Sequence, residues 1–171
     1  FARPVAPAFR RTDVNALLQE TVSKFELQKA GMACQIRPDI PCSPCYADVD
    51  PDLLIRTLTN ILKNAFEANN GEGMVEITAA HRADAWTVEI VDNGEGIAPE
   101  NLQKIFNPFF TTRAKGAGLG LSYAFQAIKA HGGAISAQNR AEKGAVFRIE
   151  IPLPRGGESD DPPSGADGGE P

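Results

Sequence analysis

The stretch of sequence that decides the fold of this chain is Asp92-Asn93-Gly94-Glu95-Gly96, which comes at the end of a predicted strand over residues 86–92. The strand alternates apolar and polar residues, as a strand with one buried face does. Asp92 is in phase with the apolar positions, so we expect its carboxylate to point toward the buried face. A buried carboxylate is costly unless hydrogen-bond donors meet it. The exocyclic amine of a purine would be such a donor.

The two glycines of this run favour the close approach of a ligand. Gly94 and Gly96 lack the Cβ atoms that would keep a flat ring away from the backbone. The alternative is a strand that ends in an ordinary Asp-Asn-Gly turn. Taken alone, the run favours that turn.

A second glycine-rich run, Gly116-Ala117-Gly118-Leu119-Gly120-Leu121, shifts the balance toward a ligand site. Glycines at alternating positions permit backbone geometries that aim several N–H groups into one concavity. The helical pattern over residues 121–130 places a helix N-terminus, with its partial positive charge, at the same point. A flexible linker, the alternative, would not set leucines between its glycines and continue directly into a helix. Together the two runs predict a nucleotide site with a purine corner and a phosphate cradle.

A third element is a helix predicted from Pro51 to about Asn69, because Asp50 suits the N-cap and proline suits the first helical position. Its apolar side comprises Leu54, Leu58, Ile61, Leu62 and Ala65. Its polar side comprises Asn60, Lys63, Asn64 and Glu67. Asparagine is a weak helix former, so two asparagines on this side favour a binding role over a merely solvated face. Their amide oxygens can ligate a hard cation such as Mg²⁺, and the lysine beside them can meet phosphate oxygens.

These three elements, in this order, resemble the ATP-binding catalytic domain of sensor histidine kinases, within the superfamily shared with type II topoisomerases, MutL-type repair proteins and one class of chaperones. The matching motifs are an N box at residues 60–68, a first glycine box at 92–97, an F box at 105–113 and a second glycine box at 116–121. The resemblance spans roughly residues 13–154. The Asn-Pro-Phe-Phe-Thr-Thr form of the F box and the Glu-Ala ending of the N box are most similar to the nitrogen-regulation class.

The resemblance implies ATP or ADP as a ligand and assigns residues to it. Asp92 would fix the adenine, with Ile97, Phe109 and Phe110 as apolar walls. The other implied nucleotide-binding residues are Glu67, Gly94, Gly96, Thr112, Gly116, Gly118, Leu119, Gly120 and Leu121. One departure from the family pattern is the late glycine motif at residues 143–147, which lacks its usual hydroxyl residues.

The resemblance also implies Mg²⁺ and a set of catalytic residues. Asn64, together with Asn60, would hold the ion. Lys63 and Arg113 would neutralise charge on the phosphate oxygens. The segment from about residue 98 to 117 would be a mobile lid that orders with nucleotide.

Position 60 separates the hypotheses about the reaction. ATP-hydrolysing members of the superfamily and anti-sigma serine kinases tend to carry a Glu there, which activates water or a serine hydroxyl, whereas Asn60 cannot take a proton. A histidine acceptor is already nucleophilic, so Asn60 favours a histidine kinase. A degenerate nucleotide-binding scaffold is the remaining alternative, and the retained Asp92, Asn64 and glycines argue against it.

The phosphoryl acceptor is expected on another domain, because neither His81 nor His131 lies in a phosphoacceptor motif. His81 lies at a predicted strand end, and His131 ends the helix that precedes Gly132-Gly133. We therefore expect this chain to bind ATP and, alone, to phosphorylate nothing. An upstream helical domain would supply the histidine, dimerise the longer protein and pass the phosphoryl group to a response regulator. The fragment itself is expected to be a monomer.

Composition fits a compact cytosolic domain of 171 residues. The formal charge is −5, but residues 156–171 hold five acidic residues and no basic one, so the rest is balanced at 17 of each sign. This balance does not predict nucleic-acid binding. No stretch approaches the roughly 20 apolar residues of a membrane span.

The predicted organisation has three parts: a linker over residues 1–12, the ATP-binding domain over 13–154 and a disordered acidic tail over 155–171. The chain starts with Phe1 rather than Met, so we expect it to be cut from a longer protein. That protein would be cytoplasmic, either entirely or as the cytosolic part of a membrane-anchored sensor.

The predicted element order is helix, two strands, helix, two strands, short helix, loop, helix and two strands. The first helix is capped by Asp13 and closed by Gly31, and Pro99 opens the short helix, which runs to about Ile105. The strands are predicted near 32–37, 44–48, 74–80, 86–92, 134–139 and 145–153. Three long helices and about six strands predict an α+β two-layer sandwich, with the helices on one face of a mixed, mostly antiparallel sheet. The resemblance identifies this as a Bergerat-type fold.

The cysteines carry less information. Cys42 and Cys45 have CxxC spacing, and Cys34 is the third thiol. A structural zinc site needs four ligands, and neither histidine lies nearby in the sequence. Prolines around the CxxC pair indicate a loop rather than the helix start of a redox motif. We predict reduced thiols with neither a metal nor a redox role.

Overall fold

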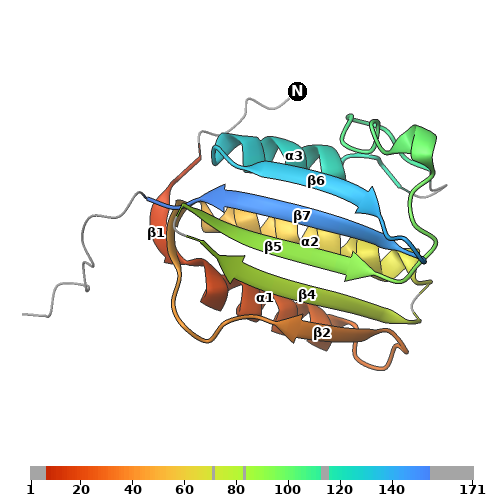
Figure 1. The fold of residues 1–171 in the computed structure, drawn as a ribbon, viewed down its shortest axis with the longest axis horizontal. Coiled ribbons are helices and arrows are strands. Elements are labelled where there is room, and N and C mark those ends of the chain that lie inside the picture. Colours follow the sequence, from red (N-terminus) through yellow and green to blue (C-terminus); the bar gives the residue numbers. More distant parts are fainter. Residues whose placement is uncertain (1–6, 71, 83, 113–115, 155–171) are drawn as a thin grey trace, which may run out of the picture.

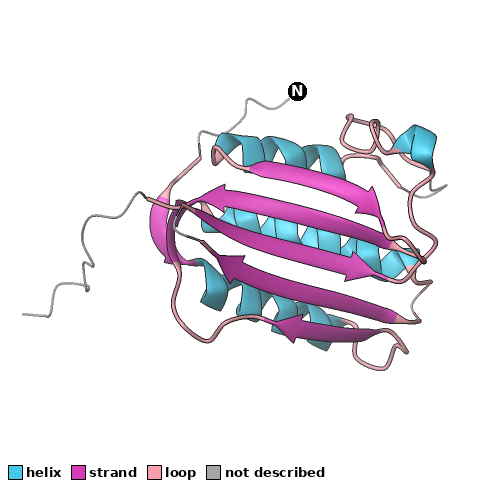
Figure 2. Cartoon of the chain, in the orientation of Figure 1, coloured by secondary structure: helices cyan, strands magenta, loops and turns pink. Residues whose placement is uncertain are grey.

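The computed structural model describes residues 7–70, 72–82, 84–112 and 116–154, which form two layers (Figures 1 and 2). One layer holds three helices: α1 (Val14–Gln28), α2 (Pro51–Ala68) and α3 (Gly120–Ala130). The other layer is a five-stranded sheet of β2 (Gln35–Asp39), β4 (Met74–His81), β5 (Ala85–Asp92), β6 (Ala134–Asn139) and β7 (Ala145–Pro152). Beside it, β1 (Arg10–Asp13) pairs with β3 (Tyr46–Val49).

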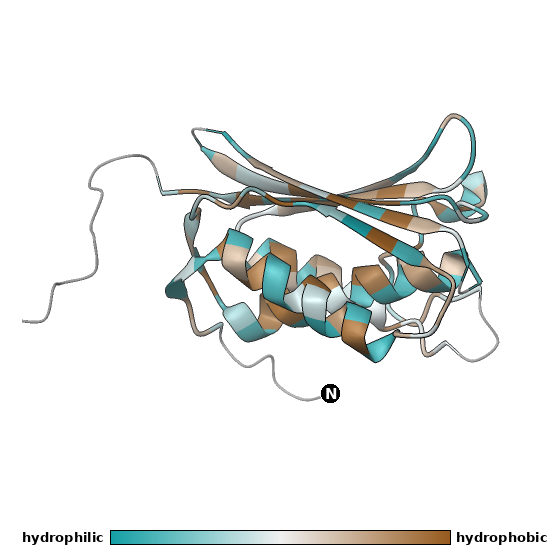
Figure 3. Cartoon of the chain, turned by 90° about the horizontal axis from the view of Figure 1, so that it is seen from below, coloured by the Kyte–Doolittle hydropathy of each residue, from teal (hydrophilic) through white to brown (hydrophobic). Residues whose placement is uncertain are grey.

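The order of strands in the sheet is β2-β4-β5-β7-β6. Only β2 and β4 are parallel, and the other neighbours are antiparallel. All three helices cover the same face of the sheet (Figure 3). The predicted α+β two-layer sandwich with a mixed, mostly antiparallel sheet is therefore confirmed. Because β7 is antiparallel to both β5 and β6, these two strands end at the same end of the sheet.

The core lies between the helices and the sheet. The sheet contributes alternate residues, among them Trp86, Val88 and Ile90 of β5 and Phe147, Ile149 and Ile151 of β7. The apolar stripe predicted for α2 is buried with them. The other face of the sheet is polar, and there Glu89 and Arg148 form an ion pair of 3.3 Å across β5 and β7. This alternation fixes the phase of every residue that ends a strand.

Both predicted helix N-caps, Asp13 and Asp50, are confirmed. Asp50 Oδ1 accepts the backbone N–H groups of Asp52 and Leu53 at 3.1 Å, and its Oδ2 accepts that of Ala8 at 2.9 Å. Burial raises the pKa of Asp50, but these hydrogen bonds outweigh burial and hold the pKa below its ordinary value. The carboxylate therefore ties the N-terminal segment to the start of α2.

Two local predictions were wrong in detail. The strand β1 lies largely inside the predicted linker, because it is stabilised by antiparallel pairing with β3, whose position no local pattern reveals. The short helix after Pro99 is only a 3₁₀ turn over Pro99–Asn101. Turns follow it, held by bonds such as Lys104 N–H to the Asn101 carbonyl at 2.8 Å. The predicted acidic tail lies outside the described residues.

Within the described ranges, no helix combines the length and the apolar character needed to cross a bilayer.

Candidate nucleotide-binding site

Asp92, the last residue of β5, is only 1% exposed, as its phase in the strand predicts. Its Oδ1 atom accepts the backbone N–H of Gly94 at 2.9 Å and that of Ala145 at 3.2 Å. The second donor comes from the first residue of β7. Because both donors belong to the backbone, the fold itself sets the orientation of the carboxylate.

The glycines around Asp92 are required by packing. A Cβ on Gly94 would collide with the backbone carbonyl of Ala68 at the end of α2. A Cβ on Gly144, in the turn between β6 and β7, would collide with the carbonyl of Asp92, and the φ of Gly144 is 101°. The interpretation that Gly94 lacks a Cβ atom so that a flat ring can approach the backbone was therefore wrong. The end of α2 occupies the space where that Cβ would lie. A nucleotide contact of Gly94 stays a prediction.

The N box and the second glycine box lie side by side where α2 packs on α3. Asn60 Nδ2 donates to the carbonyl oxygen of Gly120, the first residue of α3, at 3.2 Å. One turn earlier on α2, the guanidinium of Arg56 stacks over the ring of Tyr123 at 4.0 Å from its centroid. Because the Nδ2 half of the Asn60 amide is engaged, its Oδ1 is the half that can ligate a cation.

The rest of the polar stripe of α2 is accessible. Asn64, like Asn60, is half-buried, whereas Lys63 and Glu67 are exposed. Lys63 Nζ lies 3.9 Å from Glu67 Oε1. An exposed pair of this kind contributes little free energy, so it does not prevent the lysine from turning toward phosphate oxygens.

The F box and the second glycine box contact each other. Phe109 N–H donates to the carbonyl of Gly118 at 3.0 Å, and a Cβ on Gly118, whose φ is 67°, would collide with the Phe109 backbone. Phe110, like Ile97, packs against the core, but Phe109 is 67% exposed. Of the two phenylalanines predicted to wall the adenine, the structure thus holds only Phe110 against the protein.

The helix α3 begins at the second glycine box. Its N-cap residue, Leu119, makes no side-chain hydrogen bond to the first turn. The first N–H groups of α3 are therefore left without that cap, as a helix end that binds an anion would require. Leu121 packs against the core, while Gly116 and Thr112 are exposed. Arg113 lies outside the described residues.

Comparison with known families gives a match over residues 49–155 to the family described as "Histidine kinase-, DNA gyrase B-, and HSP90-like ATPase". The chain belongs to this family. Among its curated relatives, the sensor histidine kinase ZraS of Escherichia coli K12 is 30% identical over 88% of the chain. The histidine-protein kinase AtoS of the same organism is 36% identical over 93% of the chain. The chain spans 32% of ZraS and 26% of AtoS, so it corresponds to about a third of such relatives or less.

Solved structures of histidine kinases have the same fold. The catalytic domain of the histidine kinase ThkA superposes with a TM-score of 0.77 at 33% identity, and the match covers 84% of this chain and 95% of that domain. ThkA in complex with the response regulator TrrA gives a TM-score of 0.74 at 32% identity, over 86% of this chain and 42% of ThkA. The predicted type of catalytic domain is thereby confirmed. The similarity to the nitrogen-regulation class stays a prediction.

His131, the C-cap residue of α3, is held by hydrogen bonds within the fold. His131 is 7% exposed, and its Nε2 accepts the backbone N–H of Asp50 at 2.9 Å. Its Nδ1 lies 2.6 Å from the carbonyl oxygen of Ala127 and, because Nε2 accepts, Nδ1 is the ring nitrogen that donates there. The ring of Phe9 packs edge-on against it. The prediction that His131 is a helix terminus is confirmed, and His81 is the exposed last residue of β4.

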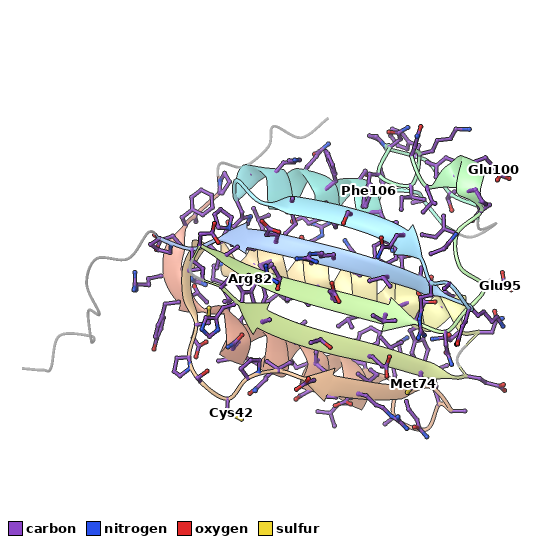
Figure 4. The ribbon with its side chains drawn as sticks, viewed as in Figure 1. Cys42, Met74, Arg82, Glu95, Glu100 and Phe106 are labelled. Carbon is purple, nitrogen blue, oxygen red and sulfur yellow. The ribbon has the colours of Figure 1, made fainter. Side chains whose placement is uncertain are left out.

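The two thiols of the CxxC pair, Cys42 and Cys45, lie away from the site, and the Cys45 N–H donates to the Asp13 carboxylate at the start of α1. Figure 4 places Cys42 at the opposite end of the molecule from Glu95, which belongs to the first glycine box of the family. All three cysteines are free, with Cys45 buried and Cys42 exposed. Burial, and then the nearby Asp13 carboxylate, raise the pKa of Cys45, which disfavours its reactive thiolate. Among the described residues, no group of three or more His, Cys, Asp or Glu side chains could hold a metal ion.

Sequence reasoning missed three residues around the family's site: Ala145, Arg56 and Asn139. Ala145 acts through its backbone, so its side chain carries no signal. Arg56 lies one turn from Asn60 on the stripe of α2, a spacing that could have suggested it. Asn139 is an ordinary polar residue at the end of β6, and only its side-chain hydrogen bonds to the backbone of Ile97 place it beside the first glycine box.

Proposed function

We propose that this chain is the catalytic domain of a sensor histidine kinase, which binds Mg-ATP and donates the γ-phosphoryl group to a histidine on a separate domain. The observation that carries the proposal is the 3.2 Å hydrogen bond from Asn60 to Gly120. The hydrolysing members of the superfamily carry a Glu at this position. This chain has an amide there, which donates to the second glycine box. An amide cannot accept a proton from water, so the arrangement suits transfer to an acceptor that is already nucleophilic.

Adenine would bind at Asp92. The carboxylate, oriented by the N–H groups of Gly94 and Ala145, would accept a hydrogen bond from the exocyclic amine of the base. Ile97 and Phe110, both packed against the core, would provide apolar contacts to the ring. A buried acceptor of this kind discriminates strongly against bases that do not offer a donor there.

The phosphates would lie between α2 and α3. Asn64 and Asn60, half-buried on one side of α2, fit Mg²⁺, because amide oxygens are hard ligands and this ion takes few protein ligands. Bound there, the ion would neutralise charge on the phosphate oxygens during transfer. Lys63 and Arg113 would add positive charge, and the N–H groups at the start of α3 would cradle the phosphates.

The partners of the longer protein are part of the same proposal. An upstream helical domain would carry the acceptor histidine and make the protein a cytoplasmic homodimer, while this chain alone is a monomer. The small share of ZraS that the chain spans, 32%, supports a second domain. The complex of ThkA with TrrA supports a response regulator as the final recipient of the phosphoryl group.

The decisive experiment restores the upstream domain and incubates the longer protein with γ-labelled Mg-ATP. We expect an acid-labile, base-stable phosphohistidine, and none on the present chain alone. Acid-stable phosphoserine on a partner would indicate a serine kinase. Rapid phosphate release by the present chain would indicate an ATPase, and failure of ATP to raise its melting temperature would indicate a scaffold.

A further inference from the structure

Asn139, the last residue of β6, uses both halves of its side-chain amide on one backbone unit of the first glycine box. Its Oδ1 accepts the N–H of Ile97 at 2.8 Å, and its Nδ2 donates to the carbonyl of Ile97 at 2.6 Å. The two residues are 42 positions apart in the sequence. The contact resembles a single rung of a β-ladder, made by a side chain instead of a strand.

The residue paired with Asn139 in the sheet holds the start of the same glycine box. Asn139 pairs with Ala145 in the β6–β7 register, and the Ala145 N–H donates to Asp92 Oδ1 at 3.2 Å. One pair of residues thus fixes two points of the glycine box: Asp92 at its start through Ala145, and Ile97 at its end through Asn139. Between them the chain turns through Gly96, whose φ of 79° requires glycine.

We propose that Asn139 is a positioning residue of the nucleotide site, which holds Ile97 at a fixed distance from Asp92 so that an adenine ring fits between its acceptor and its apolar wall. The inference rests on the proposed function and deepens it. Asn139 itself touches no nucleotide in this proposal. Asn139 is exposed, so its hydrogen bonds to Ile97 order the glycine box and do not stabilise the packed core.

The pair of hydrogen bonds between the Asn139 side chain and the Ile97 backbone requires an amide. It needs an acceptor and a donor side by side at the length of an asparagine side chain. An aspartate has the same shape, but its carboxylate sets one oxygen against the Ile97 carbonyl oxygen. That repulsion raises the pKa of the new carboxyl above its ordinary value of about 3.9, because it disfavours the charged form. Once protonated, the carboxyl again offers one acceptor and one donor.

The experiment measures Mg-ATP affinity by calorimetry for the wild type, Asn139→Ala, Asn139→Asp and the control Gln138→Ala. Gln138 is the exposed neighbour on β6, and its side chain points to the other face of the sheet. We expect Asn139→Ala to bind about tenfold more weakly, as the loss of two hydrogen bonds that order a loop implies. Gln138→Ala should bind as the wild type does.

The pH profile of Asn139→Asp tests positioning directly. Its affinity relative to wild type should be about tenfold lower at pH 8 and should recover as the pH falls toward about 5, where the carboxyl begins to protonate. The neighbouring charged residues in the sequence, Glu95, Arg140 and Lys143, are common to both proteins, so their effects on affinity cancel in the ratio. A loss of general stability would not produce this recovery.

Three results decide the matter. Wild-type affinity in Asn139→Ala, or a flat ratio of Asn139→Asp to wild type across this pH range, overturns the inference and leaves the proposed function intact. Absence of ATP binding in the wild type overturns the proposed function and the inference with it. If Asn139→Ala does not fold, the pH profile of Asn139→Asp relative to wild type decides, because that ratio does not need the alanine variant.

Discussion

The carboxylate of Asp92 is engaged by the protein before any ligand arrives, since its Oδ1 accepts N–H groups from Gly94 and Ala145. A substitution that keeps the shape of Asp92 and removes its charge separates its contacts with the protein from its proposed contact with adenine. An asparagine at this position can keep its oxygen on those two donors. Its NH₂ group then faces the purine amine, donor against donor.

We therefore expect Asp92→Asn to lose about 2–4 kcal/mol of ATP binding free energy, because the mismatch leaves buried polar groups unpaired. Calorimetric titration with Mg-ATP measures the loss, and circular dichroism checks that the variant is folded. An unchanged dissociation constant in a folded variant would remove adenine from this position.

The metal ligand is tested at Asn64. Replacing it with Ala removes an oxygen ligand, so nucleotide binding should no longer respond to Mg²⁺. The measurement is the ratio of ATP affinities with Mg²⁺ and with EDTA. Asn64→Asp keeps an oxygen in place and is the matched control, in which the response should persist. If Asn64→Ala gains as much affinity from Mg²⁺ as the wild type does, another residue holds the ion.

At the scale of elements, α1 and α2 could be predicted because their signals are local: Asp13 and Asp50 cap them, and apolar stripes mark the buried side. The strand β1 could not, since its stability comes from pairing with β3. The same limit applies to the site. The sequence predicts a buried Asp92, but not that α2 fills the space beside Gly94, because that contact joins elements distant in the chain.

The hydrogen bond between Asp50, the N-cap of α2, and His131, the C-cap of α3, can be tested by its effect on stability. In His131→Ala the buried N–H of Asp50 loses its acceptor, so the free energy of unfolding should fall by about 1–3 kcal/mol. Urea denaturation measures it. His81→Ala, at the exposed end of β4, is the control and should leave stability unchanged. Equal stability of the two variants would show that the His131 contacts contribute nothing net.

Across the whole molecule, α2 and α3 connect two ends with different roles. At one end, β1 and Asp50 bring the N-terminal segment against the C-terminal end of α3, through Ala8, Phe9 and His131. At the other end lie the glycine box with Glu95 and the segment after Pro99 (Figures 1 and 4). Between them Asn60 of α2 donates to the carbonyl of Gly120 in α3, so a displacement of either helix would also move the second glycine box.

That bond also shapes the test of reaction class. The isolated chain should hydrolyse ATP only at trace rates, because Asn60 donates to Gly120 and cannot act as a base. Asn60→Glu should raise hydrolysis, since a carboxylate there can polarise a water in line with the γ-phosphate. General-base gains reach about 10²–10⁴-fold in native geometry. A smaller gain is expected here, because the carboxylate loses the bond to Gly120 and faces its carbonyl oxygen.

Asn60→Ala is the control that completes this test, because it removes the same bond without adding a base. Steady-state phosphate release at saturating Mg-ATP should stay at trace level in wild type and Asn60→Ala, and rise only in Asn60→Glu. A rise in both variants would mean that the bond, and not the absence of a base, restrains hydrolysis. Brisk turnover by the wild-type chain would instead point to an ATPase, because transfer to a histidine on another domain requires that water be a poor competitor for the γ-phosphate.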